Sequence, residues 1–196
     1  MHWPRSMLMG LALLLPAGCG RFGQVDQGRV VDYDRGNGLV TLIRDSNYRA
    51  ADRPRFDVLP PVVVRIPRNP EEMGPEPAAG KLLAVDSSRR EIVTYDAGGR
   101  RFRTISYVPL AESRNIRPGE PRLRQHLPLV SREKKTITLY EPRQRLLLTL
   151  AASEEHLSLS EDTWKAGDEI RYYYKEPGQA LRMMNITQTD IRNAGK

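Results

Sequence analysis

Cys19 is the only cysteine in this chain of 196 residues, and the residues before it suggest a use for its thiol. An apolar run from Met7 to Leu15 follows Arg5 and leads to the small pair Ala17 and Gly18. This layout is typical of a secretory signal. The run has nine residues, whereas a helix that crosses a bilayer needs about twenty. The pattern therefore predicts a cleaved leader and not a transmembrane span.

Residues 16–19, Pro-Ala-Gly-Cys, resemble the lipobox of bacterial lipoproteins, although Pro16 stands where that motif usually has Leu. The resemblance implies a signal peptide over residues 1–18 and a diacylglyceryl thioether on Cys19, with a further acyl chain such as palmitate on its amine. Several acyl chains give near-permanent attachment, because each buried methylene contributes about 0.8 kcal/mol. The expected location is the cell membrane or the outer membrane, facing the periplasm. The alternatives are an ordinary secreted protein and a cytosolic protein.

Met183, Met184 and His156 are the candidate metal ligands of the last third of the chain. Thioether ligands suit Cu(I), and small periplasmic copper carriers use Met and His beside a Trp, here Trp164. Adjacent residues on a strand point to opposite faces, so Met183 and Met184 cannot both reach one ion from a regular strand. We therefore expect no cofactor, with a copper-binding protein as an alternative.

Tyr172 and Tyr174, with Trp164 nearby, are candidates for an aromatic platform that binds a glycan or a peptide. Residues 170–175 alternate with a period of two, which is typical of a strand with one buried face. Tyr173 then lies on the face opposite to the other two tyrosines. The competing interpretation is that two of the tyrosines fill the core and one lies on a basic surface.

Asp26, Asp32 and Asp34 surround the first predicted hairpin, and two carboxylates on one face could serve a glycosidase. Asp is equally common beside turns, where it accepts backbone hydrogen bonds. The chain contains no Gly-x-Ser-x-Gly, no His-Glu-x-x-His and no phosphate-binding glycine loop. His126 and His156 are expected at the surface. We predict that the protein is not an enzyme, with a hydrolase of envelope polymers as the alternative.

The formal net charge of +7 favours anionic partners such as lipid headgroups, acidic polysaccharide or nucleic acid. An exported protein seldom meets nucleic acid, so we expect none. The basic residues gather at 89–90, 100–103 and 132–135, beside predicted turns. Such clusters are either solvated surface or a patch that faces headgroups or glycans.

Strand patterns recur along the chain, whereas helix patterns are almost absent outside the leader. Each predicted hairpin pairs two β-rich runs around a polar turn, as Asn37 and Gly38 illustrate. The predicted strands are 28–34 with 39–43, 80–86 with 91–95 and 101–108, 136–140 with 145–150, and 169–175 with 180–187. Two proline-rich connectors, 54–80 and 109–128, are expected to be loops or edge segments, with a strand at 62–66.

The expected fold is mainly β, with antiparallel hairpins that form one or two small barrels of the OB or SH3-like kind. The predicted organisation is a tether over 19–27, a β domain over 28–191 and a tail over 192–196. Residues 69–79 are the best candidate for a subdomain boundary, because this stretch is rich in proline and charge.

The strand and turn pattern, together with GDEIRYYYKEPGQALRMMNITQTDI over residues 167–191, resembles an uncharacterised lipoprotein family of sulfate-reducing bacteria that carries a domain of unknown function. The resemblance implies location and a β fold, and no activity. The resulting hypothesis is a membrane-anchored lipoprotein of the cell envelope that acts as a non-catalytic binding or structural module. Its expected partners are the membrane, through the lipid on Cys19, and an envelope protein or an anionic glycan or headgroup.

Overall fold

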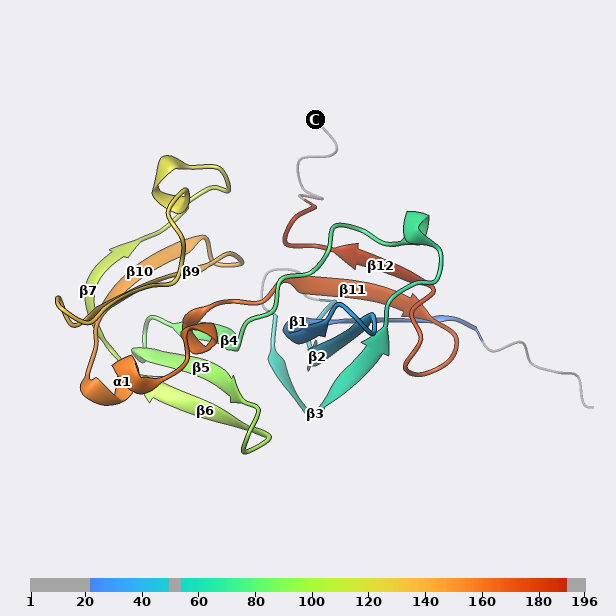
Figure 1. Cartoon of the computed structure of the whole chain (residues 1–196), viewed down its shortest axis with the longest axis horizontal. Helices are drawn as coiled ribbons and strands as arrows, with labels where there is room; N and C mark the ends of the chain where they lie inside the picture. Colours follow the sequence, from blue (N-terminus) through green and yellow to red (C-terminus); the bar gives the residue numbers. More distant parts are fainter. Residues whose placement is uncertain (1–21, 50–53, 190–196) are drawn as a thin grey trace, which may run out of the picture.

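The strands form three antiparallel sheets in residues 22–49 and 54–189, which are the residues that the computed structural model describes. Sheet A has the strand order β12-β11-β1-β2-β3, sheet B has the order β4-β5-β6, and sheet C has the order β7-β10-β9-β8. In Figure 1 sheet A makes up one half of the molecule, and sheets B and C make up the other half.

Sheet A combines strands from both ends of the described chain. Its strands are β1 (Gln24–Asp34), β2 (Leu39–Asp45), β3 (Phe56–Arg65), β11 (Glu169–Tyr174) and β12 (Arg182–Asn185). β1 pairs with β2 on one side and with β11 on the other. Its core contains apolar side chains from all five of these strands, including Val30, Leu42, Val64, Ile170 and Met183.

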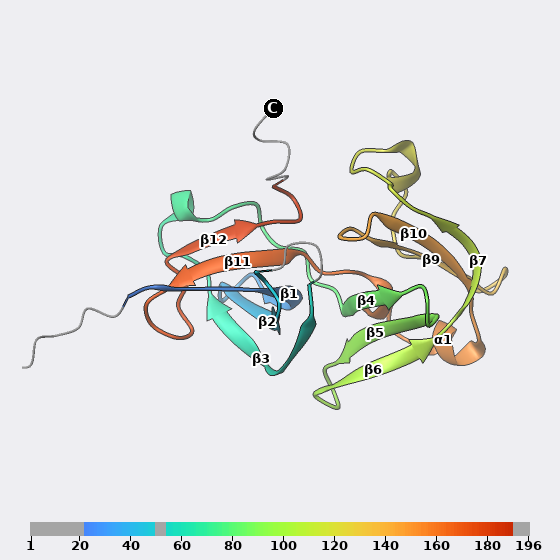
Figure 2. The ribbon, with the colours of Figure 1, turned by 180° about the vertical axis from the view of Figure 1, so that it is seen from behind.

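Sheets B and C come from the middle of the chain. Sheet B contains β4 (Leu82–Asp86), β5 (Glu91–Asp96) and β6 (Arg101–Ser106). Sheet C contains β7 (Val108–Ser113), β8 (Leu129–Ser131), β9 (Thr136–Glu141) and β10 (Leu146–Ala151). β6 passes into β7 through the buried Tyr107, so one extended segment serves both sheets. Figure 2 shows these two sheets from behind, facing each other around one core.

Short helical segments connect or cover the strands. They are η1 (Pro70–Glu72), η2 (Pro121–Leu123), α1 (Glu154–Ser158) and η3 (Glu161–Trp164). α1 begins with a capping box, in which the Ser153 hydroxyl accepts from the His156 N–H and the His156 ring accepts from the Ser153 N–H. Leu157 and Trp164 then pack into the core between sheets B and C.

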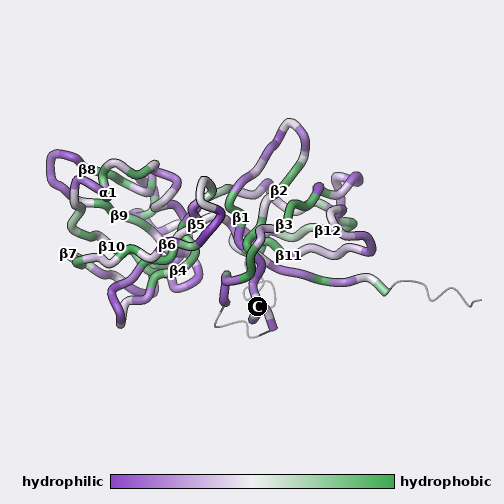
Figure 3. The backbone as a smooth tube through the Cα atoms, turned by 90° about the horizontal axis from the view of Figure 1, so that it is seen from below, coloured by the Kyte–Doolittle hydropathy of each residue, from purple (hydrophilic) through white to green (hydrophobic). Residues whose placement is uncertain are grey.

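Four of the hairpin turns, those after β1, β4, β5 and β9, share one construction in which a carboxylate at the end of a strand accepts N–H groups of the turn. Asp34 accepts from Asn37 N at 3.0 Å, Asp96 from Gly99 N at 3.1 Å, and Glu141 from Gln144 N at 2.6 Å. The last turn residue has a left-handed backbone, as at Gly38 and Arg145. Figure 3 shows the hairpin tips as hydrophilic segments beyond more hydrophobic strands.

The halves meet at a buried ion pair. The Arg29 guanidinium on β1 lies 2.8 Å from the Glu141 carboxylate on β9, and both side chains are at most 2% exposed. Arg29 also donates to the Leu83 carbonyl on β4 at 3.2 Å, and it stacks 4.5 Å above the Phe56 ring on β3. Leu83 and Phe56 belong to an apolar cluster shared by sheets A and B. One arginine therefore contacts all three sheets.

The prediction of a mainly β fold with little helix is confirmed, and the predicted hairpins are present. The prediction of barrels is wrong for the described residues, because the three sheets remain open. β1 begins at Gln24, so residues 24–27, expected in the tether, belong to the sheet. The proline-rich connectors contain edge strands, β3 with Pro60 and β7 with Pro109.

Candidate functional site: a groove on sheet A

One face of sheet A is covered at one end and open at the other. Arg29 lies at the covered end and pairs with Glu169 across β1 and β11. Further along the same face the register places Gln27 opposite Arg171, and then Val25 opposite Tyr173. Side chains of directly paired residues lie on one face of a sheet, so this series leads from the buried junction to solvent. Val25 is 42% exposed, which marks the open end.

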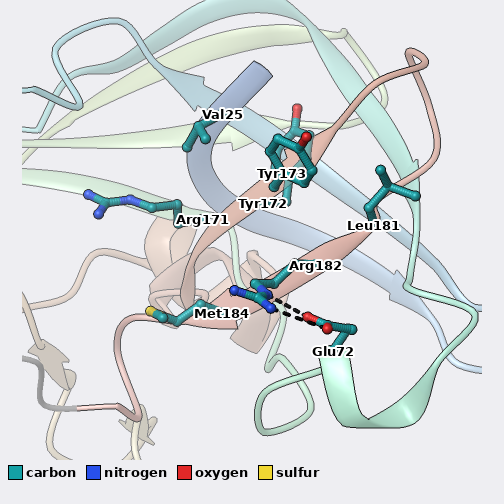
Figure 4. A pocket seen from close by; sticks show the side chains of 8 residues that line it. All are labelled: Val25, Glu72, Arg171, Tyr172, Tyr173, Leu181, Arg182 and Met184. Carbon is teal, nitrogen blue, oxygen red and sulfur yellow. Dashed lines mark hydrogen bonds and ion pairs between the residues drawn. The ribbon is translucent and has the colours of Figure 1, made fainter. Parts of the chain in front are cut away.

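β12 extends this open end. Its Arg182 pairs with Tyr173, and its Met184 pairs with Arg171. Together with Leu181 and the η1 residue Glu72, these side chains line a pocket of about 540 Å³ (Figure 4). Tyr172, which also borders the pocket, sends its own ring into the core on the other face.

A second hollow of about 460 Å³ adjoins the first at Leu181, which lines both and is 43% exposed. It lies beside the turn between β11 and β12. Its other lining residues are Arg68, Asn69, Lys175, Glu176, Gln179 and Ala180. We refer to the two hollows together as the sheet A groove.

Two arginines of the sheet A groove, Arg171 and Arg182, are held in defined positions by hydrogen bonds. Arg182 donates from Nη2 to Glu72 Oε1 at 3.2 Å and from Nε to Glu72 Oε2. The hydrogen bond from Arg182 lowers the pKa of Glu72, and the pKa of Arg182 is raised by the same contact. Arg171 donates from Nε and Nη2 to Gln27 Oε1 at 3.0 Å and 2.8 Å.

A network of buried polar side chains lies behind the sheet A groove and extends to Arg29, where the two halves meet. Gln27 donates to Glu169 and, at 3.4 Å, to Asp45. Glu169 also faces Arg143, whose Nη1 lies 3.6 Å from its carboxylate. Burial raises the pKa of Glu169, an effect opposed by the neighbouring Arg143 and Arg29. These contacts fix the position of Arg171 at the edge of the groove.

The start of the described chain passes directly beside the sheet A groove. The Tyr173 ring lies over Gly23, and a Cβ atom at that position would overlap the ring. Phe22, one residue earlier, is 93% exposed. The described chain therefore enters the fold at the groove. Cys19 and the signal peptide themselves lie outside the described residues.

The groove combines aliphatic, thioether and phenol groups with guanidinium and ammonium groups at its edge. Arg171, Arg182, Arg68 and Lys175 supply positive charge, and Glu72 and Glu176 supply negative charge. Such a surface suits the noncovalent binding of an amphipathic molecule with an anionic group.

The predicted copper ligands are not brought together. Met183 is 2% exposed in the core of sheet A, and Met184 lies on the opposite face in the groove. His156 lies on α1 in the other half (Figure 1), where its ring packs against Trp164 at 5.7 Å between centroids. No group of three or more His, Cys, Asp or Glu side chains suited to a metal ion occurs in the described part of the chain.

The predicted aromatic platform is divided between two cores. Tyr172 is 3% exposed in sheet A and stacks on the half-buried Tyr174, whose hydroxyl donates to Asp26 at 2.9 Å. Trp164 is 1% exposed in the other half. Tyr173 is the member of the tyrosine run that reaches the groove, as the competing interpretation allowed.

The other candidate residues, which are the carboxylates, His126 and the basic clusters, lie at turns or on exposed surface. Asp34 accepts the Asn37 hydrogen bonds of its turn, and Asp32 is exposed on β1. His126 is exposed, as expected, and contacts Glu161 at 3.1 Å. The basic clusters lie at separate turns with acidic neighbours, as in the contacts Arg89 to Asp86 and Lys135 to Glu154.

Val25, Leu181 and Tyr173 are groove residues that were not candidates from the sequence. Strand alternation predicts that Tyr173 and Tyr172 point to opposite faces of their strand. The groove also needs the pairing of β1 with β11, which lie more than a hundred residues apart in the chain, and alternation does not predict that pairing. Alternation alone does not tell which face is left open.

Among residues 22–49 and 54–189, no helix is both long and apolar enough to span a bilayer. No curated protein matches the chain significantly, and no solved structure does so. The family described as Domain of unknown function (DUF4881) matches residues 21–194. Because this match covers nearly the whole described chain, the protein belongs to the DUF4881 family.

Proposed function

We propose that the protein is a lipid-anchored component of the cell envelope that acts as a noncatalytic binding module, with the sheet A groove as its binding surface. The observation that carries this proposal is the position of the groove: its residue Val25 lies six residues after Cys19, the expected lipid attachment site. The anchor and the groove then act at the same place, at the surface of the cell membrane or the outer membrane on its periplasmic side.

Two features support this arrangement. The family match begins at residue 21, two residues after the last lipobox-like residue, Cys19. Leu181, Met184 and Val25 leave apolar surface open to solvent in one hollow, and contiguous exposed apolar surface of this kind marks interaction sites. The polar network behind the groove holds Arg171 in place, so the surface is formed before any ligand arrives.

The anchor is tested by expressing the full precursor in a bacterial host beside Cys19→Ala, with Gly20→Ala as the matched control. We expect the native protein and Gly20→Ala to lose residues 1–18, gain the mass of the lipid and sediment with membranes. Cys19→Ala should show neither the lipid mass nor stable attachment. Intact mass and cell fractionation measure both properties, and an unmodified native protein in the soluble fraction would refute the proposal.

A further inference from the structure

We infer that the occupant of the sheet A groove is the anionic phospholipid surface of the membrane that holds the anchor, an inference that rests on the proposed lipidation of Cys19. Under this inference the lipid on Cys19 only keeps the protein near the bilayer. The groove then binds the bilayer itself and fixes the orientation of the whole molecule.

The first argument is distance. Gly23 lies four residues after Cys19, and an extended chain spans roughly 3.5 Å per residue, so the distance between them is about 14 Å at most. Gly23 is held under the Tyr173 ring at the edge of the groove. A connecting segment of this length keeps the groove close to the leaflet that holds the acyl chains.

The second argument is the chemistry of the side chains around the point of entry. Phe22 is almost fully exposed, and Val25, Leu181 and Met184 are 38–43% exposed. Tyr173 lies among them with a phenol, a group that favours the boundary between hydrocarbon and water. Contact with the acyl and headgroup boundary would remove this apolar surface from water.

The third argument is charge. The groove brings Arg68 and Lys175 beside Leu181, while Arg171 and Arg182 lie on the other side of it. Glu72 and Glu176 offset half of this charge, and the excess is positive. Basic residues close to apolar contacts are attracted by anionic leaflets. Phosphate groups would lie at Arg68 and Lys175 when the apolar side chains face the acyl chains.

Sheet C provides an internal comparison. Val108 on β7 is 64% exposed, more than any apolar residue of the groove. β7 lies in the half of the molecule away from the strand that follows Phe22 (Figure 1). If exposure alone decided membrane contact, Val108 would be inserted. If the anchor and the groove charges decide it, Leu181 is inserted and Val108 stays in water.

The experiment places one spin label on lipidated protein in nanodiscs of phosphatidylglycerol and phosphatidylethanolamine. Leu181→Cys and the matched control Val108→Cys each add a single free thiol, because Cys19 is the only native cysteine and its sulfur would be blocked by lipid. We expect the label at 181 to be several-fold less accessible to an aqueous relaxation agent than the label at 108, and more accessible to oxygen.

The charge argument is tested in the Leu181→Cys background. The double change Arg68→Glu and Lys175→Glu should abolish the protection of the label at 181, whereas Lys134→Glu, on the turn between β8 and β9, should leave it intact. Nanodiscs of phosphatidylcholine alone should give weaker protection than anionic ones. Equal protection in both lipids would overturn the anionic headgroup as the ligand.

The two proposals fail in different ways. A native protein without added lipid mass overturns the anchor, and this inference with it. A lipidated protein whose label at 181 is as accessible as the label at 108 overturns only the inference. Protection at 181 that appears only when a second envelope protein is added would also overturn it and assign the groove to that protein.

Discussion

Arg29 is the residue on which the joint between the two halves depends. Its guanidinium is buried with Glu141 and also binds the Leu83 carbonyl. Burying two charges is costly, and a buried ion pair often contributes no more stability than apolar residues of equal volume. Removing one partner is different, because the other charge then stays in the interior without compensation.

We therefore expect Glu141→Gln to reduce the free energy of unfolding by about 3–5 kcal/mol, the cost of breaking a buried ion pair. Glu154→Gln is the matched control, since Glu154 is 76% exposed and contacts Lys135 at 3.1 Å. Loss of such a surface pair should cost less than about 1 kcal/mol. Urea denaturation measures both values, and similar losses in the two variants would contradict the assigned role of Arg29.

Glu169 makes the free energy of unfolding depend on pH. Burial raises its pKa above the ordinary 4.5, so the folded state binds the proton more tightly than the unfolded state does. This contribution to stability is fully present below pH 4.5 and is lost as the pH rises through the folded-state pKa. The free energy of unfolding of the native protein, relative to Glu169→Gln, should therefore fall from pH 4.5 towards neutrality.

Urea denaturation of the native protein and Glu169→Gln at matched pH values measures this difference. A difference that stays flat, or that grows as the pH rises, would show that Glu169 binds its proton no more tightly in the folded state.

Gln27 also shows where residue type misled the sequence prediction. A polar stretch after an expected anchor favours a tether, and Gln27 was assigned to one. Its burial depends on Glu169 and Asp45, which are provided by other strands. For Tyr173 the prediction was correct, because strand alternation alone places its side chain on the face opposite to those of Tyr172 and Tyr174.

Strands and turns were the most predictable elements because their causes are local. A carboxylate at a strand end and a turn residue with a left-handed backbone lie within four positions of each other, as with Asp34 and Gly38. The pairing of β1 with β11 and the passage of one segment from sheet B to sheet C at Tyr107 depend on distant partners. For that reason the hairpins were predicted correctly and their closure into barrels was not.

Backbone segments pack closely where the chain crosses between the halves. The chain leaves sheet A before Gly80 and returns through Gly167, and the Gly80 N–H donates to the Val30 carbonyl at 3.2 Å. A Cβ atom at Gly167 would overlap the Val30 carbonyl oxygen and lie 3.0 Å from the Gly80 nitrogen. Only backbone fits at this point.

Gly167→Ala should therefore lower the free energy of unfolding by at least about 3 kcal/mol, the upper end of ordinary overpacking costs, because backbone atoms must move. Gly98→Ala is the control, since its Cβ atom would meet nothing closer than the Asp96 carboxylate at 3.5 Å. Thermal unfolding of both variants checks this. Equal melting temperatures for Gly167→Ala and the native protein would show that the crossing can relax.

At the scale of the whole molecule, the two halves share an apolar cluster as well as the ion pair. Val31, Ile43 and Phe56 from sheet A pack with Leu83 and Tyr95 from sheet B. Two halves joined by buried contacts of this kind are expected to unfold together, in one cooperative transition.

Trp164 allows cooperative unfolding of the two halves to be tested. It is buried between sheets B and C, and the other tryptophan, Trp3, lies in the predicted leader. Its fluorescence reports on one half, and circular dichroism reports on both. The two urea transitions should coincide in the native protein and separate in Tyr95→Ala, which removes a shared contact. Leu139→Ala, within the core of the same half, should lower the midpoint without separating them.

Sheet A is built from the first and last strands of the described chain, and this sets the order in which the protein can be completed. As the exported chain emerges amino terminus first, β1, β2 and β3 appear early, but the partner edge of β1 stays unpaired until β11 follows more than a hundred residues later. Pairings between distant segments form slowly, and unpaired edges invite association with other chains. Sheets B and C can form while β1 waits. The emerging chain is therefore most prone to aggregate through its amino-terminal hairpin, and a chaperone would need to shield that hairpin until β11 has emerged.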